Sequence, residues 1–358
     1  MVSEQVDEPT EAKLHFSSNN IKKVACGGGH TILIDKDGKL YSCGWNSMHQ
    51  LGCDKEVYTL ERVWKLSGIN FINIACGWDF SCAVSDDHFL FVWGSNTKGQ
   101  LGLPREHFPN VVKPFRLQVI ANSVAMGLRH TAIINSKGEV WVTGCGKHGQ
   151  LGMGKETTSL DRFQKIPSLG CMSHIACGQN HTVAWSSIEN ALYVWGDNKH
   201  GQLLLSTEKY QKIFTPQKID IDVKQKVLKL MSGWTNVIIL LENGNTLGWG
   251  RNNYGQLGTT NSAVGSVTHI KLPDGRKVKD IAVGSEHTIC LANDNTLWSW
   301  GWNEHGNTGT KTAECVFTPT KVLNSNNENG KVTQIFAGSA HNFVVIENSL
   351  DYNKNTEE

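Results

Sequence analysis

The sequence lacks any long hydrophobic run, any excess of one charge and all but a little proline. No apolar stretch approaches the ~18 residues that a membrane-spanning helix requires, so we expect no membrane insertion. The 34 lysines and arginines are matched by 33 aspartates and glutamates. This balance disfavours binding to nucleic acid or chromatin through bulk positive charge. The acidic, polar start, MVSEQVDEPTEAK, is typical of neither a signal peptide nor a transit peptide.

The ten cysteines contain no CxxC pair, so they do not indicate a disulfide framework or a metal site. Cys26, Cys76 and Cys177 occupy one position of a repeat, and each therefore lies on a different structural unit. We expect buried, reduced thiols in a protein of the cytoplasm, with the nucleus as a second compartment.

Glycine is abundant, with 36 residues, and it marks the repeat. The first motif is usually alanine, then a small or apolar residue, glycine, two variable residues and usually histidine. It recurs seven times at steps of 50 to 55 residues, with its glycine at Gly27, Gly77, Gly127, Gly178, Gly233, Gly284 and Gly338. The second motif, fullest as WGSNTKGQLG, recurs six times, with its first glycine at Gly44, Gly94, Gly144, Gly196, Gly250 and Gly301.

Between the two motifs, apolar residues alternate with polar ones around a glycine-containing turn, as in HTILIDKDGKLYSCG. This pattern predicts a β-hairpin. A weaker strand signal, such as ERVWKL or VKPFRL, precedes each first motif. About four strands in a period of about fifty residues are typical of a β-propeller blade. The sequence therefore predicts an all-β protein.

These motifs resemble the repeats of the regulator of chromosome condensation family, whose members are seven-bladed β-propellers. The resemblance covers residues 11–348. The order ACGWDF, GLRH, SGWT, GSEH and SWGWNEHG is further similar to the secretion-regulating guanine nucleotide exchange factor branch of that family. The expected domain is one propeller at 11–348, between a disordered acidic arm at 1–10 and a disordered tail at 349–358. Its expected repeats are 11–60, 61–111, 112–160, 161–213, 214–266, 267–316 and 317–348.

Two counts depart from the family pattern. No step exceeds 55 residues, so there is no room for the wedge-like hairpin that the family's exchange factor inserts. The second motif occurs once less often than the first, so we expect the seventh blade, 317–348, to lack a strand. A blade that lacks a strand leaves a sheet edge open at the closure of the ring.

The sequence contains no motif typical of a catalytic, phosphate-binding or metal-binding site. Gly149 to Lys155 spells GxxxxGK, but Glu156 stands where a phosphate-binding loop needs Ser or Thr. The histidines of the first motif lie on separate repeats without HxH or HxxxH spacing, so we expect structural hydrogen bonds from them. These are His30, His130, His181, His287 and His341. We expect no catalytic residue, metal or cofactor in the chain, so any exchange activity would act on a partner's nucleotide.

The two variable residues of the first motif are the best binding candidates, because equivalent turns of a propeller form a ring on one face. In the family's exchange-factor member, acidic and histidine residues of this pair touch the GTPase, which implicates Asp79, Arg129 and Glu286 by position. Trp78 and Trp234 would be aromatic anchors, and SWGWNEHG adds a loop in the sixth blade. The expected partner surface comprises Trp78, Asp79, Arg129, Trp234, Glu286, Trp302, Glu304 and His305.

The resemblance implies a monomeric, protein-binding propeller. Its partner would be a small GTPase or a component of secretion control, and its activity guanine nucleotide exchange or regulation. A non-catalytic adaptor that binds without exchange is an alternative, favoured by the missing wedge. A chromatin-binding propeller is a third, and the acidic N-terminus speaks against it.

Overall fold

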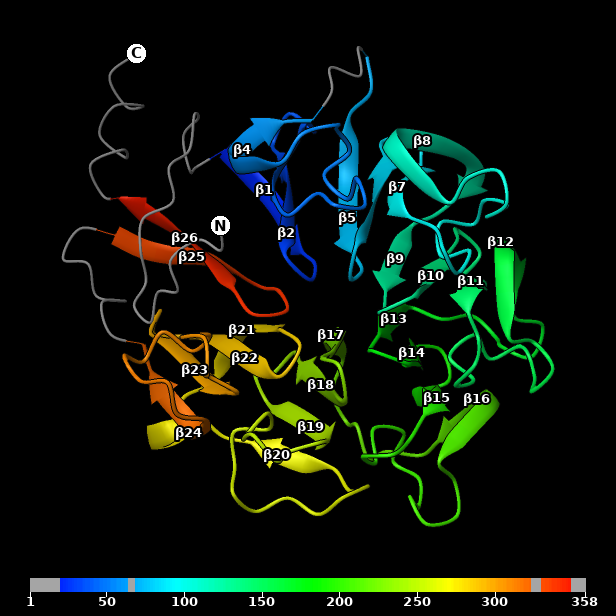
Figure 1. Ribbon diagram of the computed structural model, residues 1–358. Coiled ribbons are helices and arrows are strands. Elements are labelled where there is room, and N and C mark those ends of the chain that lie inside the picture. The colour runs from blue at the N-terminus through cyan, green and yellow to red at the C-terminus, as the bar shows by residue number, and fades with distance from the viewer. Residues whose placement is uncertain (1–19, 64–67, 323–329, 349–358) are drawn as a thin grey trace.

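The computed structural model describes residues 20–63, 68–322 and 330–348. Six four-stranded antiparallel sheets and one two-stranded sheet surround a common axis (Figure 1). In each four-stranded sheet the strands follow chain order from the axis outward. We number these sheets blades 1 to 6. The predicted arm at 1–10 and tail at 349–358 lie outside the described residues.

Blades 1 to 3 contain β1 (Ile21–Cys26), β2 (His30–Asp35), β3 (Leu40–Gly44), β4 (Val57–Arg62); β5 (Phe71–Cys76), β6 (Phe80–Ser85), β7 (Phe89–Ser95), β8 (Asn110–Ile120); β9 (Ser123–Met126), β10 (His130–Ile134), β11 (Val140–Cys145) and β12 (Ser159–Lys165). Blades 4 to 6 contain β13 (His174–Cys177), β14 (His181–Ser186), β15 (Ala191–Asp197), β16 (Lys212–Ile219); β17 (Val227–Ser232), β18 (Asn236–Leu241), β19 (Thr246–Gly250), β20 (Thr268–Ile270); β21 (Val278–Val283), β22 (His287–Ala292), β23 (Leu297–Gly301) and β24 (Val316–Lys321). The two-stranded sheet contains β25 (Gly330–Ala337) and β26 (Asn342–Asn348), and a short 3₁₀ helix, η2 (Pro273–Gly275), precedes β21.

The prediction of an all-β propeller is confirmed, and the prediction of seven blades needs correction. The described residues form six complete blades, and the two-stranded sheet lies between blade 6 and blade 1, where the incomplete seventh was expected (Figure 1). The strand that opens each predicted repeat also pairs with the preceding blade. For example, β8 is the outer strand of blade 2, although all but its first two residues fall in the predicted repeat 112–160. No helix among the described residues is long and apolar enough to cross a membrane.

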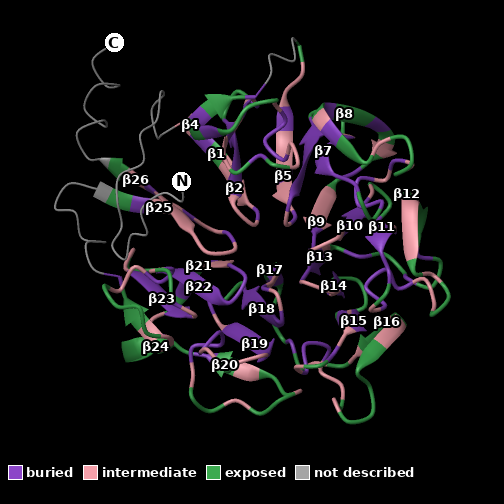
Figure 2. Ribbon diagram, in the orientation of Figure 1, coloured by how far each residue is buried: buried purple, intermediate pink, exposed green. Residues whose placement is uncertain are grey.

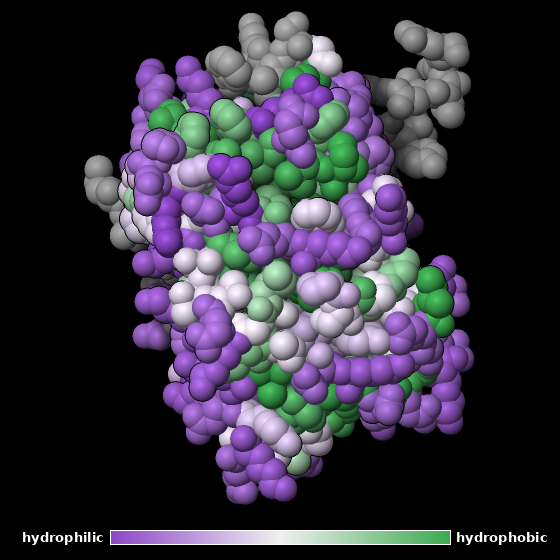
Figure 3. Space-filling model, turned by 90° about the vertical axis from the view of Figure 1, so that its right-hand side faces the viewer, coloured by the Kyte–Doolittle hydropathy of each residue, from purple (hydrophilic) through white to green (hydrophobic). Residues whose placement is uncertain are grey.

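The second strand of each complete blade is buried along its whole length, as in β6 and β14 (Figure 2). Outer strands such as β8 alternate between buried and exposed residues. Figure 3 views the rim from the side of β8, β12 and β16, where hydrophilic residues cover much of the surface and hydrophobic ones are visible between them. Buried inner strands and amphipathic outer strands are the pattern expected of blades that pack face to face.

The second motif joins each blade to the next. The indole N–H of Trp93 in β7 donates to the backbone carbonyl of Gln50 in blade 1 at 2.8 Å. Leu51, which follows this glutamine, is fully buried. The same indole bond recurs in Trp195–Gln150, Trp249–Gln202 and Trp300–Gln256 at 2.9 to 3.0 Å. Both roles predicted from the sequence, tryptophan as a group that packs between blades and leucine as a plug, are confirmed.

The seam between blade 6 and the two-stranded sheet is different. Its loop reads Gly306-Asn307-Thr308-Gly309, so Thr308 (2% exposed) replaces the buried leucine. The buried side-chain amide of Asn307 has no hydrogen-bond partner among the described residues. The backbone carbonyl of Asn307 accepts from Asn342 Nδ2 of β26 at 2.6 Å. Polar contacts thus replace the tryptophan and leucine at this seam.

The two-stranded sheet is nevertheless joined to blade 1. The hydroxyl of Thr31 lies 3.0 Å from His341 Nε2, and Gln334 Nε2 donates to the carbonyl of Ile21 at 3.2 Å. Val345 of β26 is buried in a cluster with apolar residues of blade 1. The ring therefore closes near its axis through contacts of β25 and β26.

Candidate functional site

One end of the ring carries the turns of the first motif. In an antiparallel sheet, the turn after the first strand and the loop after the third leave from the same end. The turns therefore surround the axis, and the longer loops that contain the second motif lie around them. We call this end the axial face. Its turns are 27–29, 77–79, 127–129, 178–180, 233–235, 284–286 and 338–340.

A belt of backbone hydrogen bonds links these turns. The amide of Gly28 donates to the carbonyl of Trp78 at 3.0 Å, and the amide of Trp234 donates to that of Ser285 at 2.8 Å. The belt crosses from the two-stranded sheet to blade 1 through Ser339 N–H to Gly27 O at 3.3 Å. The other members are Leu128 to Gln179, Gln179 to Trp234 and Ser285 to Gly338, at 2.9 to 3.3 Å.

Trp78 of blade 2 is half-buried and lies against Gly28 of blade 1. A Cβ added to Gly28 would come within 2.7 Å of the Trp78 carbonyl oxygen and 2.8 Å of its indole ring. Real Cβ atoms do not come that close to other heavy atoms, so only glycine fits at position 28 with this ring in place. The glycine-rich turn of blade 1 therefore has a specific reason: it accommodates the tryptophan of blade 2.

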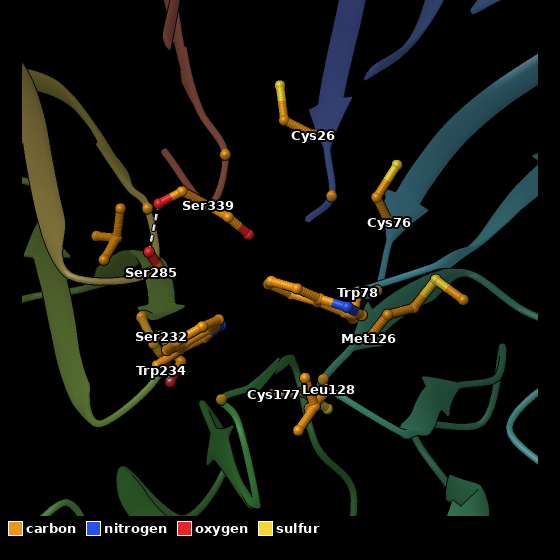
Figure 4. A pocket seen from close by; sticks show the side chains of 18 of the residues that line it. Cys26, Cys76, Trp78, Met126, Leu128, Cys177, Ser232, Trp234, Ser285 and Ser339 are labelled. Carbon is orange, nitrogen blue, oxygen red and sulfur yellow. Dashed lines mark hydrogen bonds between the residues drawn. The ribbon is translucent and has the colours of Figure 1, made fainter. Parts of the chain in front are cut away.

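Trp78 and Trp234 meet at the axis although 156 residues separate them in the sequence. Their ring centroids are 5.5 Å apart and their planes are inclined by 49°. Both line a cavity of about 100 Å³ at the centre of the axial face. Figure 4 shows Trp78 reaching toward the middle of this cavity, with Trp234, Ser285 and Ser339 on the opposite side.

Asp79 and Arg129 form an ion pair between the turns of blades 2 and 3. The side chain of Asp79 is 10% exposed and that of Arg129 is 29% exposed. The structure thus brings these two predicted residues together, but it directs their charges at each other. Their position fits a bond that holds neighbouring blades, and only Arg129 retains appreciable exposure to a partner.

Glu286 is also held within the ring. It is buried, accepts a hydrogen bond from Gln256 Nε2 at 2.5 Å and lies 3.5 Å from Arg251 Nη1. Burial raises the pKa of this carboxyl, and the hydrogen bond and Arg251 oppose that shift. Arg251 in turn lies over the ring of Tyr254, 4.6 Å from its centroid. A cluster of polar side chains from blades 5 and 6, namely Arg251, Gln256 and Glu286, therefore borders the axial turns.

The predicted residues of blade 6 lie on the outer loop of the same face. Trp302 is partly buried, and its ring meets that of His305 edge-to-face at 5.0 Å. Its amide donates to the carbonyl of Glu286 at 2.8 Å, which ties this loop to the axial turn. Glu304 and His305 are exposed.

Sequence reasoning missed Trp45. It is 50% exposed and packs against Gly29, where a Cβ would lie 3.5 Å from its side chain. Trp45 follows the first glycine of the second motif, as Trp302 does in blade 6. That shared position was the signal available in the sequence. Aromatic residues from blades 1, 2, 5 and 6 therefore lie on the axial face.

The histidines of the first motif form hydrogen bonds between blades. His30 Nε2 lies 2.8 Å from Ser81 Oγ of the next blade, and His130 Nε2 lies 2.9 Å from Thr182 Oγ1. The remaining bonds are His181–Ser232, His287–Asn342 and His341–Thr31 at 2.9 to 3.0 Å. The expected structural role of these histidines is confirmed. Within residues 20–63, 68–322 and 330–348, no group of three His, Cys, Asp or Glu side chains is placed to hold a metal ion.

The sequence matches the RCC1-like domain family over residues 2–344. The mouse protein named secretion-regulating guanine nucleotide exchange factor is 31% identical over 386 residues, covering 96% of this chain and 80% of the relative. The ultraviolet-B receptor UVR8 of Arabidopsis thaliana is 31% identical over 313 residues, covering 85% and 70%. Human HERC3, named a probable E3 ubiquitin-protein ligase, is 34% identical over 359 residues, covering 94% of this chain but 34% of that protein.

Solved structures show the same fold. Human WBSCR16 superposes with a TM-score of 0.83 at 24% identity, covering 96% of this chain and 89% of that one. Prp20p of Saccharomyces cerevisiae, whose structure was described with its binding to Gsp1p and histones, superposes with a TM-score of 0.81 at 22% identity. It covers 94% of this chain and 85% of that one. At these identities the likeness concerns the fold alone.

Proposed function

The chain belongs to the RCC1-like domain family, and on that premise we propose that it binds a protein through the axial face and regulates a small GTPase. The axial face is the observation that carries this proposal. It combines half-exposed tryptophans on rigid turns with exposed charged residues, the composition typical of the energetic centre of a protein interface. Exchange activity and a role in secretion control are the finer part of the proposal, supported by the name of the mouse relative.

In this proposal the axial face acts by shape and charge. A preformed ring of turns needs little ordering when it binds, which favours docking onto a mobile loop of a partner. Trp45 and Trp78 would be the aromatic anchors, while Glu304, His305 and Arg129 would supply polar contacts around them. Docking onto the switch loops of a GTPase would disfavour its bound nucleotide and magnesium.

The test is nucleotide release measured across a panel of small GTPases with stoichiometric protein. We expect the chain to accelerate nucleotide release from one member of the panel. The substitution Trp45→Ala or Trp78→Leu should reduce this acceleration at least tenfold. Ile188→Ala is the matched control, because Ile188 is 79% exposed in the turn between β14 and β15 at the opposite end of the ring. A panel in which no member responds would sink the exchange claim.

The adaptor function is the second candidate, because the long insertion that an exchange wedge needs is missing from the described blades. An adaptor would bind a partner in a pull-down, lose it in Trp45→Ala and leave nucleotide release at background. Binding to chromatin would instead require capture of nucleosomes that weakens with salt.

We place this activity in the cytoplasm, with the nucleus as a second compartment, and expect a monomer. All ten cysteines are free thiols. Burial raises the pKa of thiols such as Cys177, to about 12, so they stay protonated and unreactive. Free thiols are typical of proteins in reducing compartments. Fractionation of cells and gel filtration of the purified chain test these two points.

A further inference from the structure

We propose that the cavity at the centre of the axial face receives one cationic side-chain group of a partner, a guanidinium or a methylated ammonium. This inference rests on the proposed function, because it names the chemistry by which the axial face would recognise a protein. Three features of the cavity support it: its aromatic walls, its uncharged but oxygen-rich lining, and its size.

Two tryptophans provide the aromatic walls. The faces of an indole carry negative electrostatic potential and attract cations within about 6 Å of the ring centroid. Trp78 and Trp234 come from blades on different sides of the axis, and their inclination of 49° leaves them at an angle to each other rather than stacked flat (Figure 4). Blade 1 keeps glycine at position 28 against the Trp78 ring. Two independent parts of the chain are thus fitted to hold this ring at the axis.

The lining favours a cation over an anion. None of the residues that line the cavity is charged, and burial raises the pKa of the lining thiols, such as Cys76 and Cys177, so they are neutral. The backbone N–H groups of the belt already donate to neighbouring turns, whereas each carbonyl oxygen has a second lone pair. Ser285 Oγ also donates to the carbonyl of Ser339. The carbonyl oxygens of the belt therefore keep acceptor capacity that the N–H groups of a cation can use.

The size restricts what enters. A cavity of about 100 Å³ is well below the roughly 300 Å³ at which pockets for drug-sized ligands begin. It holds a single head group and excludes a nucleotide. Without a carboxylate, the cavity offers little to a strongly hydrated ammonium. It suits weakly hydrated cations, namely guanidinium and methylated ammonium.

The experiment compares choline with 3,3-dimethyl-1-butanol, its neutral isostere, on the full chain. Binding is followed by NMR through the indole N–H signals, with those of Trp78 and Trp234 assigned from single substitutions. We expect choline to shift both signals and to bind at least tenfold more tightly than the neutral isostere. Equal binding of the two compounds, or shifts confined to other tryptophans, overturns the inference.

Substitutions of Trp78 distinguish the contribution of its aromatic face to cation binding from its contribution to the stability of the fold. Trp78→Leu should weaken choline binding about tenfold, while Trp78→Phe, which keeps an aromatic face, should retain part of it. Thermal unfolding of each variant identifies any that fails to fold, and Trp234→Leu then replaces it. Undiminished choline binding in both leucine variants overturns the inference.

A second arm distinguishes a partner's side chain from a free cation. Short peptides with one arginine or one trimethyllysine should bind more tightly than choline if neighbouring turns contact the peptide backbone. Peptides that bind more weakly than choline overturn the assignment to a side chain. Because no partner is needed here, failure of the cavity to bind cations is distinguishable from failure of the GTPase assay.

Discussion

At the scale of single residues, the axial face depends on adjacent glycines with different tasks. Gly28 makes room for the ring of Trp78, whereas Gly29 only borders Trp45 at an ordinary contact distance. Neither requirement can be read from the repeat, because the two positions vary from blade to blade. The contacts that decide them come from a neighbouring blade, about fifty residues away.

Replacing each glycine by alanine tests this difference. Gly28→Ala places a methyl group within 2.7 to 2.9 Å of Trp78, so we expect it to displace the ring and lower the free energy of unfolding by about 1–3 kcal/mol. Gly29→Ala is the matched control and should change stability by less than about 1 kcal/mol. Urea unfolding measures both, and equal effects would contradict the assigned role of Gly28.

Asn236 occupies the histidine position of the first motif but makes no side-chain hydrogen bond to the next blade among the described residues. It stands in blade 5 where four other blades and the two-stranded sheet have histidine, and it is 1% exposed. Neither atom of its side-chain amide has a hydrogen-bond partner among the described residues. An amide is too short to span the distance that histidine covers to the next blade. In blade 4, His181 reaches Ser232 Oγ at 3.0 Å.

We therefore expect Asn236→His to stabilise the protein by about 1 kcal/mol, through a new hydrogen bond to Thr288 of blade 6. The reverse change, His181→Asn, should destabilise it by about 1–3 kcal/mol, because it leaves a buried amide unpaired. Thermal unfolding of the two variants beside the wild type is the measurement. A loss of stability in both would show that Asn236 has a partner in solution.

Asp79 and Arg129 illustrate the limit of site prediction from sequence. Family resemblance points to them as partner contacts, and that assignment stays a prediction. The structure adds that they pair with each other across the seam of blades 2 and 3. Their spacing of 50 residues equals one repeat, so equivalent turns of adjacent blades bring them together. Whether opposite charges at that spacing pair or face outward depends on side-chain packing, which a repeat alignment does not contain.

At the scale of elements, strands and blades follow directly from the sequence. Apolar alternation around glycine turns predicts the hairpins, and the tryptophan and leucine of the second motif predict the seams. The count of complete blades does not follow in the same way. A missing second motif predicts an incomplete blade, but the polar replacement of leucine by Thr308 at its seam becomes meaningful only when its neighbours are known.

The second strand of the two-stranded sheet is the clearest exception among the elements. In blades 1 to 6 every described second strand is buried along its length and paired on both sides. In β26, Phe343, Val344 and Ile346 are only partly buried, and the described pairing is with β25 alone.

We expect backbone amides on the open edge of β26 to exchange with solvent at least about tenfold faster than those of β22, since a local opening energy lower by about 1.4 kcal/mol suffices. Alternate amides, which face β25, should remain protected, so protection should alternate along the strand. Residue-resolved hydrogen exchange measures this. Uniform protection in β26, equal to that of β22, would show that another strand covers the edge in solution.

At the scale of the whole molecule, the ring is held by equivalent contacts repeated around the axis. The belt of the axial turns and the bonds from the first-motif histidines both continue through β25 and β26 into blade 1. An opening at any one seam therefore weakens contacts that neighbouring seams share. A propeller of this kind should unfold cooperatively, and conditions that disturb all histidines at once should act on the entire ring.

Acid is such a condition. Burial lowers the pKa of His30 and His181 to about 3 and of His130 and His287 to about 4, against an ordinary value of 6.5. Between those values the unfolded chain binds protons that the folded ring does not, so stability is full above about pH 7 and falls as the pH drops below 6.5. Burial lowers the pKa of His341 on the two-stranded sheet to about 4 as well, but this residue is partly exposed, so solvent screens its contribution more than that of these four.

Each buried histidine contributes about 1.4 kcal/mol per pH unit in that window, so the four together contribute about 6 kcal/mol per pH unit, or roughly 7 to 8 kcal/mol between pH 7 and pH 5. A domain in the lower half of the usual range of about 5–15 kcal/mol should then unfold on going from pH 7 to about pH 5. His130→Phe should reduce the slope by about a quarter, and Phe80 shows that blade 2 accommodates phenylalanine at the equivalent buried position. Urea midpoints between about pH 5 and pH 8 give the two slopes. Identical slopes for wild type and variant would mean that His130 does not titrate with unfolding, and that the acid sensitivity of the ring lies in its carboxylates.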